Sequence, residues 1–184
     1  MLEIRSLGLD GLYELRPERL SDDRGFFSET WSERALAEAG FHLHFVQDNH
    51  SLSREAGVLR GLHFQAPPMA QDKLVRVARG AVFDVAVDIR PGSPTYKQWA
   101  GVRLSAADWN QLLVPSGFAH GFLALEPDTE VQYKVTAPYS REHDRAIRFD
   151  DPAIGIEWPM AKEALILSDK DRAAPLLADV DTGF

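Results

Sequence analysis

The chain has 184 residues, of which 45% are hydrophobic and 26% are charged, the balance of an ordinary globular protein. Its formal net charge is −8 at pH 7, and a negative field of this kind opposes non-specific binding to nucleic acids and to anionic membranes. The sequence contains no cysteine, which excludes disulfide bonds, thiolate metal sites and a cysteine nucleophile.

One helix is predicted near the N-terminus, at residues 32–39. Thr30 and Glu33 have the spacing of a capping box, and Gly40 suits the C-terminal end of this helix. The residues before the helix include early acidic side chains and no apolar stretch, so a secretory signal is not expected. No linker or repeat interrupts the sequence, and we therefore expect residues 1–184 to form a single domain.

Short strands separated by turns are predicted for most of the remaining sequence. Segment 81–90 is the most apolar run, but Asp84 and Asp88 interrupt it, so no membrane span is expected and we expect a cytoplasmic location. Its alternation places Phe83, Val85, Val87 and Ile89 on one face and Asp84, Ala86, Asp88 and Arg90 on the other. Further strands are predicted at 73–79, 98–104, 111–115, 118–125 and 129–136. This pattern favours an all-β sandwich or barrel, whose ligands bind in the interior or at the mouth.

Considered one at a time, the polar residues do not identify a site. His42 and His44 form an HxH pair without a third ligand nearby, so two surface imidazoles are expected. His63 and His120 lie among apolar residues beside glycines that let a backbone or a ligand approach, yet each alone is more simply a structural histidine. Four further polar residues also have simple structural interpretations. Tyr133 is typical of a core tyrosine and Lys73 of a solvated lysine. Asp171 is typical of a polar turn, and Arg24 is expected to pair with nearby aspartates.

Eight short motifs, taken together, carry more information than any single residue. They are Asp-Arg-Gly-Phe-Phe (23–27), Phe-Val-Gln-Asp-Asn-His (45–50), Leu-Arg-Gly-Leu-His-Phe-Gln (59–65), Lys-Leu-Val-Arg (73–76), Phe-Asp-Val-Ala-Val-Asp-Ile-Arg (83–90), Pro-Ser-Gly-Phe-Ala-His-Gly-Phe (115–122), Gln-Tyr-Lys (132–134) and Ser-Asp-Lys-Asp (168–171). In this order they closely resemble the dTDP-4-dehydrorhamnose 3,5-epimerase family, from Leu12 to Leu177. The resemblance implies a cupin-like jelly-roll β-barrel with a few short peripheral helices, a homodimer, and no metal or organic cofactor. It also implies that C3 and C5 of dTDP-4-dehydro-6-deoxy-D-glucose are inverted to give dTDP-4-dehydro-6-deoxy-L-mannose, in dTDP-L-rhamnose biosynthesis.

The resemblance also implies roles for the residues at matching positions. His63 matches the proton-abstracting base, Asp171 the carboxylate paired with it, and Tyr133 the proton donor. Lys73 matches the group beside the keto oxygen of the substrate. The implied substrate-binding residues are Arg24, Phe27, Glu29, Gln47, Asn49, Arg60, His120, Tyr139, Asp144 and Lys170, with Glu more common than Asp in the family at position 144. Residues near Glu29 are implied to reach the site of a partner subunit.

These residue types suit proton transfer next to a ketone. A neutral imidazole is a suitable base near pH 7, and a carboxylate on its other nitrogen fixes the tautomer and stabilises the imidazolium. A cationic or donor group stabilises the developing enolate oxygen, and inversion requires an acid on the opposite face of the sugar ring. Arg24, Arg60 and Lys73 would form a small positive pocket for the diphosphate inside an acidic molecule.

A metal site is not expected. Metal-dependent cupins use an HxH pair, whereas this chain has a single histidine in Leu62-His63-Phe64-Gln65, and Phe64 would point away from His63 on a strand. Three alternative functions stay open at this point. The first is an epimerase of only C3 or C5 of a dTDP-4-keto-6-deoxy sugar in a natural-product pathway. The second is a non-catalytic sugar-nucleotide binding module, and the third is a metal-dependent cupin oxygenase.

Overall fold

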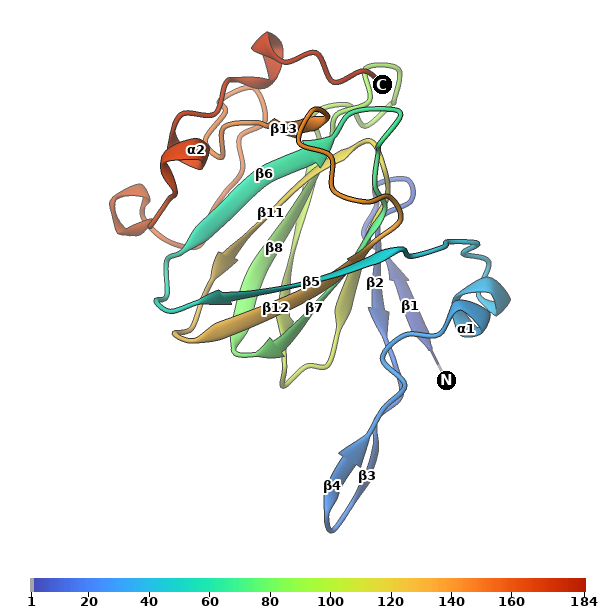
Figure 1. The fold of residues 1–184 in the computed structure, drawn as a ribbon. Helices are drawn as coiled ribbons and strands as arrows, with labels where there is room; N and C mark the ends of the chain where they lie inside the picture. Colours follow the sequence, from blue (N-terminus) through green and yellow to red (C-terminus); the bar gives the residue numbers. More distant parts are fainter. Residues whose placement is uncertain (1) are drawn as a thin grey trace.

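Two antiparallel β-sheets face one another in the computed structural model, which describes residues 2–184 (Figure 1). The six-stranded sheet contains, in spatial order, β1 (Glu3–Ser6), β2 (Tyr13–Arg16), β10 (Gln111–Val114), β7 (Lys73–Arg79), β12 (Thr129–Val135) and β5 (Gln47–Ser53). The five-stranded sheet contains β13 (Asp144–Ala146), β6 (Leu59–Gln65), β11 (Phe118–Ala124), β8 (Ala81–Asp88) and β9 (Trp99–Ser105). A separate hairpin of β3 (Leu20–Asp22) and β4 (Gly25–Phe27) projects from this body (Figure 1).

The expected all-β, jelly-roll architecture is confirmed, with the sheets forming a sandwich rather than a closed barrel. All six predicted strands are present within one or two residues of their predicted ends. The strands β5 and β6 were not among those predicted. β5 is an edge strand with polar residues at most positions, and β6 is interrupted by Gly61, so neither has a continuous apolar pattern.

The predicted helix is present as α1 (Glu33–Glu38), but its predicted cap is wrong. Ser32, not Thr30, is the N-cap, because its backbone is extended and its hydroxyl accepts a hydrogen bond from the backbone N–H of Ala35. Gly40 follows the helix with a φ of 93°, in the left-handed region that glycine adopts at little cost. The helix packs Leu36 against the outer face of the six-stranded sheet.

The side chains of β8 divide between two faces as predicted, but both faces are buried. Val82 and Ala86 lie between the sheets, in a core with residues of β7, β10, β11 and β12. Val85 and Val87 lie on the outer face of the five-stranded sheet, where the C-terminal segment 147–180 covers them. This segment contains the short helices η1 (Lys162–Ala164), α2 (Asp169–Arg172) and η2 (Leu177–Asp179), which lie outside the sheets in Figure 1. Among residues 2–184, no helix is both long and apolar enough to cross a bilayer.

Candidate active site

A cavity of about 610 Å³ lies between the two sheets. Its wall is formed by residues of β5, β6, β7, β11 and β12, together with residues near β13 and α2. Every predicted site residue lines this cavity except Arg24, Phe27 and Glu29. The sandwich therefore brings together side chains that are widely separated in the sequence.

Close contact between β6 and β11 shapes the floor of this cavity. Gly61 has a φ of 116°, and a Cβ atom there would lie 2.6 Å from the Cα atom of Gly121 on the neighbouring strand. The two glycines thus allow the backbones to approach, and the register of the strands shifts between His120 and Phe122. This arrangement pairs His63 on β6 with His120 on β11.

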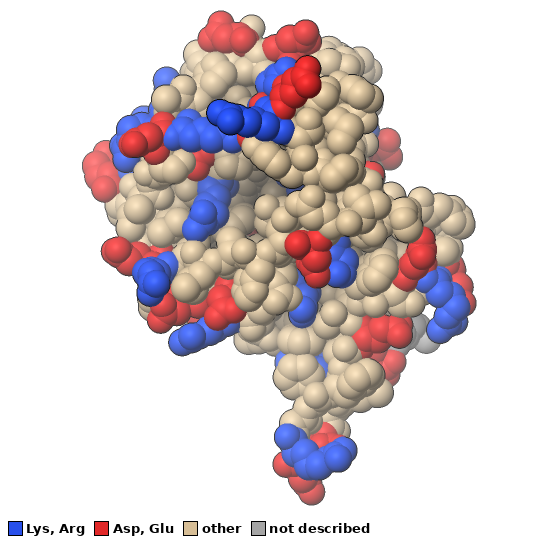
Figure 2. Space-filling model, viewed as in Figure 1, with Lys and Arg blue, Asp and Glu red and all other residues tan. Residues whose placement is uncertain are grey.

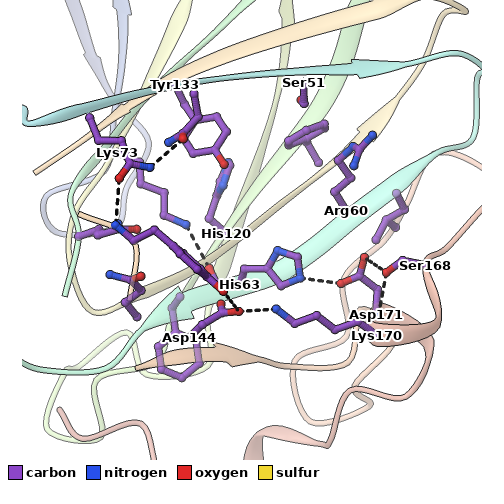
Figure 3. Close-up of a pocket in the computed structure, with 18 of the residues that line it drawn as sticks. Ser51, Arg60, His63, Lys73, His120, Tyr133, Asp144, Ser168, Lys170 and Asp171 are labelled. Carbon is purple, nitrogen blue, oxygen red and sulfur yellow. Dashed lines mark hydrogen bonds and ion pairs between the residues drawn. The ribbon is translucent and has the colours of Figure 1, made fainter. Parts of the chain in front are cut away.

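His63 forms an ion pair with Asp171 at the wall of the cavity (Figure 3). The distance between Nε2 of His63 and Oδ1 of Asp171 is 2.6 Å, although the residues are 108 positions apart in the sequence. Ser168 caps α2, donates its hydroxyl to Oδ2 of Asp171 at 2.8 Å and accepts from the backbone N–H of Asp171. Burial opposes the charge of Asp171, but the hydrogen bonds from His63 and Ser168 keep its pKa below the usual value. Asp171 is therefore a buried, ionised anchor for His63, where the simpler interpretation was a polar turn.

Lys73 is only 7% exposed, so the interpretation of a solvated lysine is wrong. It lies on the inward face of β7 with Val75 and Val77, and its Nζ donates to the backbone carbonyl of His63 at 3.3 Å. Burial lowers the pKa of Lys73 to about 8, and the charges of Asp84 and Asp144 oppose this effect. The cavity thus contains a cation that is still largely protonated at neutral pH.

Tyr133 enters the cavity from β12, in the sheet opposite to the one that carries His63 (Figure 3). Its hydroxyl pKa is raised above the usual value, because burial disfavours the phenolate more than the nearby Arg60 favours it. The phenol therefore keeps its proton at neutral pH. The imidazole of His63 and the protonated phenol of Tyr133 thus lie on two facing walls of one cavity.

The outer part of the cavity is more polar and more open. Nε2 of Gln47 donates to Oδ1 of Asn49, and Oε1 of Gln47 accepts from the backbone N–H of Tyr139, whose ring is exposed. Lys170 pairs with Asp144 across the mouth of the cavity (Figure 3). On the visible face, acidic and basic side chains are interspersed rather than gathered into one basic patch (Figure 2).

Arg24, Phe27 and Glu29 are not brought into this cavity. Arg24 lies in the turn of the β3–β4 hairpin and pairs with Asp22 at 2.6 Å, as its plain interpretation predicted. Phe27, on the same hairpin, is 71% exposed. Glu29 lines a second, more apolar cavity of about 220 Å³ beside Trp31. Within one chain, these three residues therefore do not contact the residues around His63.

Sequence reasoning gave no role to several polar residues of the site. Ser168 supports Asp171, and Asp84 accepts a hydrogen bond from His120. Ser168 precedes Asp171 by three positions, and this N-cap spacing was available as a signal in the sequence. The predicted exposure of His42 and His44 is confirmed. Within residues 2–184, no group of three or more acidic or histidine side chains is arranged to hold a metal ion.

Comparison with known proteins identifies a consistent set of relatives. A family model described as dTDP-4-dehydrorhamnose 3,5-epimerase matches residues 6–179. A protein of that name from Sinorhizobium fredii is 51% identical over 180 residues, which cover 98% of this chain and 92% of the relative. The crystal structure of an enzyme of that name from Bacillus anthracis, with TDP and PPi bound, has a TM-score of 0.93 and 48% identity, covering 96% of this chain and 99% of that one. A dTDP-6-deoxy-D-glucose-3,5-epimerase from Legionella pneumophila, solved with dTDP-4-keto-L-rhamnose, has a TM-score of 0.94 and 44% identity, covering 98% and 95%.

Proposed function

The chain belongs to the dTDP-4-dehydrorhamnose 3,5-epimerase family, and we propose that His63 and Tyr133 carry out its proton transfers. The chain is thus an epimerase that inverts C3 and C5 of dTDP-4-dehydro-6-deoxy-D-glucose, in dTDP-L-rhamnose biosynthesis. The observation that carries the assignment of residues is the placement of the His63–Asp171 pair and Tyr133 on facing walls of one cavity.

The first step is removal of a proton from the carbon next to the C4 ketone. Nε2 of His63 is bonded to Asp171, so Nδ1 is the nitrogen that is left to accept the proton. The Asp171 carboxylate stabilises the imidazolium that forms, as in the triads of hydrolases. The electron pair of the broken C–H bond moves into the enolate, whose negative charge develops on the C4 oxygen. The ammonium group of Lys73 stabilises this oxygen.

The second step returns a proton to the same carbon from the opposite face. The Tyr133 hydroxyl donates this proton, since the phenol is protonated and enters from the sheet opposite His63. The enolate collapses to the ketone with inverted configuration. Solvent restores the proton on Tyr133 and removes the one on His63, and the sequence of steps is repeated at the other carbon.

The outer part of the cavity suits the nucleotide. Arg60 and Lys170 supply positive charge for the diphosphate, and the planar guanidinium of Arg60 suits two phosphate oxygens at once. Gln47, Asn49 and the exposed ring of Tyr139 offer hydrogen bonds and a stacking surface to the base. We assign Asp144 to the junction between this region and the sugar, and the buried His120 to the sugar itself.

Exchange of solvent deuterium into the substrate tests this function. In D2O, with dTDP-4-dehydro-6-deoxy-D-glucose, NMR should show label at both C3 and C5 of the product, and treatment with a strong chelator should not slow the reaction. Label at only one carbon would identify a single-carbon epimerase. Binding of the sugar nucleotide without any exchange would identify a binding module.

We further propose a homodimer in which the β3–β4 hairpin contributes to the partner's site. The exposed Phe27 and the separation of Arg24 and Glu29 from this chain's own cavity support this arrangement. In solution, light scattering should give about twice the 20.6 kDa mass of one chain. A fully active monomer would contradict the proposal.

Mixing two inactive variants tests the contribution of the hairpin directly. His63→Asn has an intact hairpin but no base, whereas Phe27→Ala combined with Glu29→Ala has an intact base but is altered in the hairpin and in the segment that follows it. After subunit exchange, the mixture should regain about a quarter of the wild-type activity, because about half of the dimers are mixed and each has one complete site. Absence of any recovery would place the hairpin's role within its own chain.

A further inference from the structure

A second His–Asp pair lies behind the wall of the catalytic cavity. His120 on β11 is 6% exposed and lines the cavity, and its Nε2 lies 2.7 Å from Oδ1 of Asp84 on β8. Asp84 is completely buried and does not itself line the cavity. Its other oxygen, Oδ2, has no hydrogen-bond partner among residues 2–184. The His63–Asp171 pair acts in the proposed reaction, whereas the proposed mechanism uses no charge from Asp84.

A buried carboxylate with a free oxygen is costly unless a nearby positive charge compensates it. Lys73 is a buried cation of this site; it lies on the inward face of the facing sheet and interacts electrostatically with Asp84. Asp144 also interacts with Lys73, but it already pairs with Lys170 at the mouth of the cavity. Asp84 is therefore the buried anion that is left to balance the charge of Lys73.

We propose that Asp84 is a positioning residue, which fixes the ring of His120 and holds Lys73 in the charged form that the enolate requires. The first part follows from geometry: since Nε2 of His120 is bonded to Asp84, Nδ1 is left for a sugar oxygen. The second part rests on the proposed role of Lys73. Without the Asp84 charge, only the weaker effect of Asp144 would oppose burial, and the ammonium group of Lys73 would lose its proton at a lower pH.

The pH dependence of the enzyme follows from this proposal. Asp84 on β8 and Asp144 on β13 are the charges that act on Lys73. The other titratable or charged groups around the same cavity are Arg60 and His63 on β6, His120 on β11, Tyr133 on β12, Tyr139, and Lys170 and Asp171 in α2. Lys73 has a pKa of about 8. Activity should therefore fall as the pH rises through this value, when the stabilising charge at the C4 oxygen is lost.

Asp84→Asn tests the role of the charge, because asparagine has nearly the same shape and its oxygen can still accept from His120. We expect the alkaline limb of the kcat profile to move to lower pH by about one unit. At pH 9, kcat should be about tenfold lower than that of the wild type, while at pH 6.5 it should change little. KM should stay nearly constant, because Asp84 does not contact the substrate. Asp84→Glu, which retains the charge, should restore the position of the limb.

Asp88→Asn is the matched control. Asp88 lies on the same strand and is also completely buried, but it bonds to Arg90, Ser93 and Thr95 at the end of the sandwich and does not line the catalytic cavity. This variant should lower the melting temperature and leave the alkaline limb in place. If Asp84→Asn behaves in the same way, its role is structural and the proposal is overturned.

Two further outcomes are decisive. Asp84→Ser removes the charge with a smaller side chain, and failure of both neutral variants to fold would assign Asp84 to the fold alone and overturn the proposal. The failure of the proposed function is distinguishable from this result. If the wild type shows no exchange at C3 or C5, the function is wrong, whereas normal wild-type exchange with an unshifted limb in Asp84→Asn disproves only the role of Asp84.

Discussion

Replacing His63 by asparagine should lower kcat for epimerisation by about 10³-fold, because the base that removes the C3 and C5 protons is lost. Asparagine fits the space of the imidazole and can still hydrogen-bond to the buried Asp171, so the variant should fold. Deuterium should then fail to enter either carbon of the substrate. NMR in D2O measures this loss directly, at both carbons in one experiment.

The control for this experiment is the affinity for dTDP. In the proposed arrangement His63 contacts the sugar, whereas Arg60, Gln47 and Tyr139 contact the dTDP part, so calorimetry should give nearly the wild-type affinity for dTDP. His44→Asn is a matched surface variant, since His44 is exposed and pairs only with Glu33 at 3.2 Å, and its activity should be normal. More than a tenth of the wild-type activity in His63→Asn would show that another group is the base.

Replacing Tyr133 by phenylalanine should separate proton exchange from inversion. His63 still removes a proton in this variant, but no acid protonates the opposite face, so formation of the L-configured product should fall by about 10²–10³-fold. The His63 side chain is 33% exposed, which allows solvent to replace the abstracted proton. Deuterium should therefore accumulate in recovered substrate that keeps the D-gluco configuration.

This result distinguishes a proton donor from a residue that only shapes the cavity. A purely structural Tyr133 would lower exchange and inversion by the same factor. Loss of exchange in parallel with loss of product would therefore contradict the assignment of Tyr133 as the acid. Tyr13→Phe is the matched control, because Tyr13 packs against Phe41 on the outer face of the six-stranded sheet and should leave both rates unchanged.

The strands of the sandwich were predictable where side chains alternate regularly between the two faces of the sheet. The segment that became β8 alternates in sequence because its two faces pack into two different cores, and this alternation survives in the structure. β6 lacks such a pattern, because Gly61 allows close contact with Gly121 and His63 points into a cavity. The region that forms the site thus follows the general rules of strands least well.

The site residues were found through the resemblance of motifs rather than through the properties of single residues. Nothing local in the sequence links His63 with Asp171, because the contact depends on the C-terminal segment packing across the outside of a sheet. The burial of Lys73 depends on the facing sheet in the same way, so a typical strand lysine gave no sign of it. Asp84 was correctly placed opposite Val85, but its partner His120 is supplied by a strand that follows it by more than thirty residues.

The net charge of −8 is compatible with a dianionic substrate, since Arg60, Lys73 and Lys170 are gathered around one cavity. Acidic and basic groups alternate on the visible surface, so long-range attraction contributes little to binding (Figure 2). The affinity of the site should depend on a few short contacts, and among these the guanidinium of Arg60 is the strongest candidate.

The C-terminal segment 147–180 covers the outer face of the five-stranded sheet and also supplies Asp171 to the cavity. Before the C-terminal segment packs against the sheets, His63 on β6 is not in contact with α2. Its imidazole would then lack the carboxylate that selects the reactive nitrogen. Under the proposed mechanism, epimerase activity should begin only when the C-terminal segment has packed onto the sheet, so turnover should report completed folding of the chain.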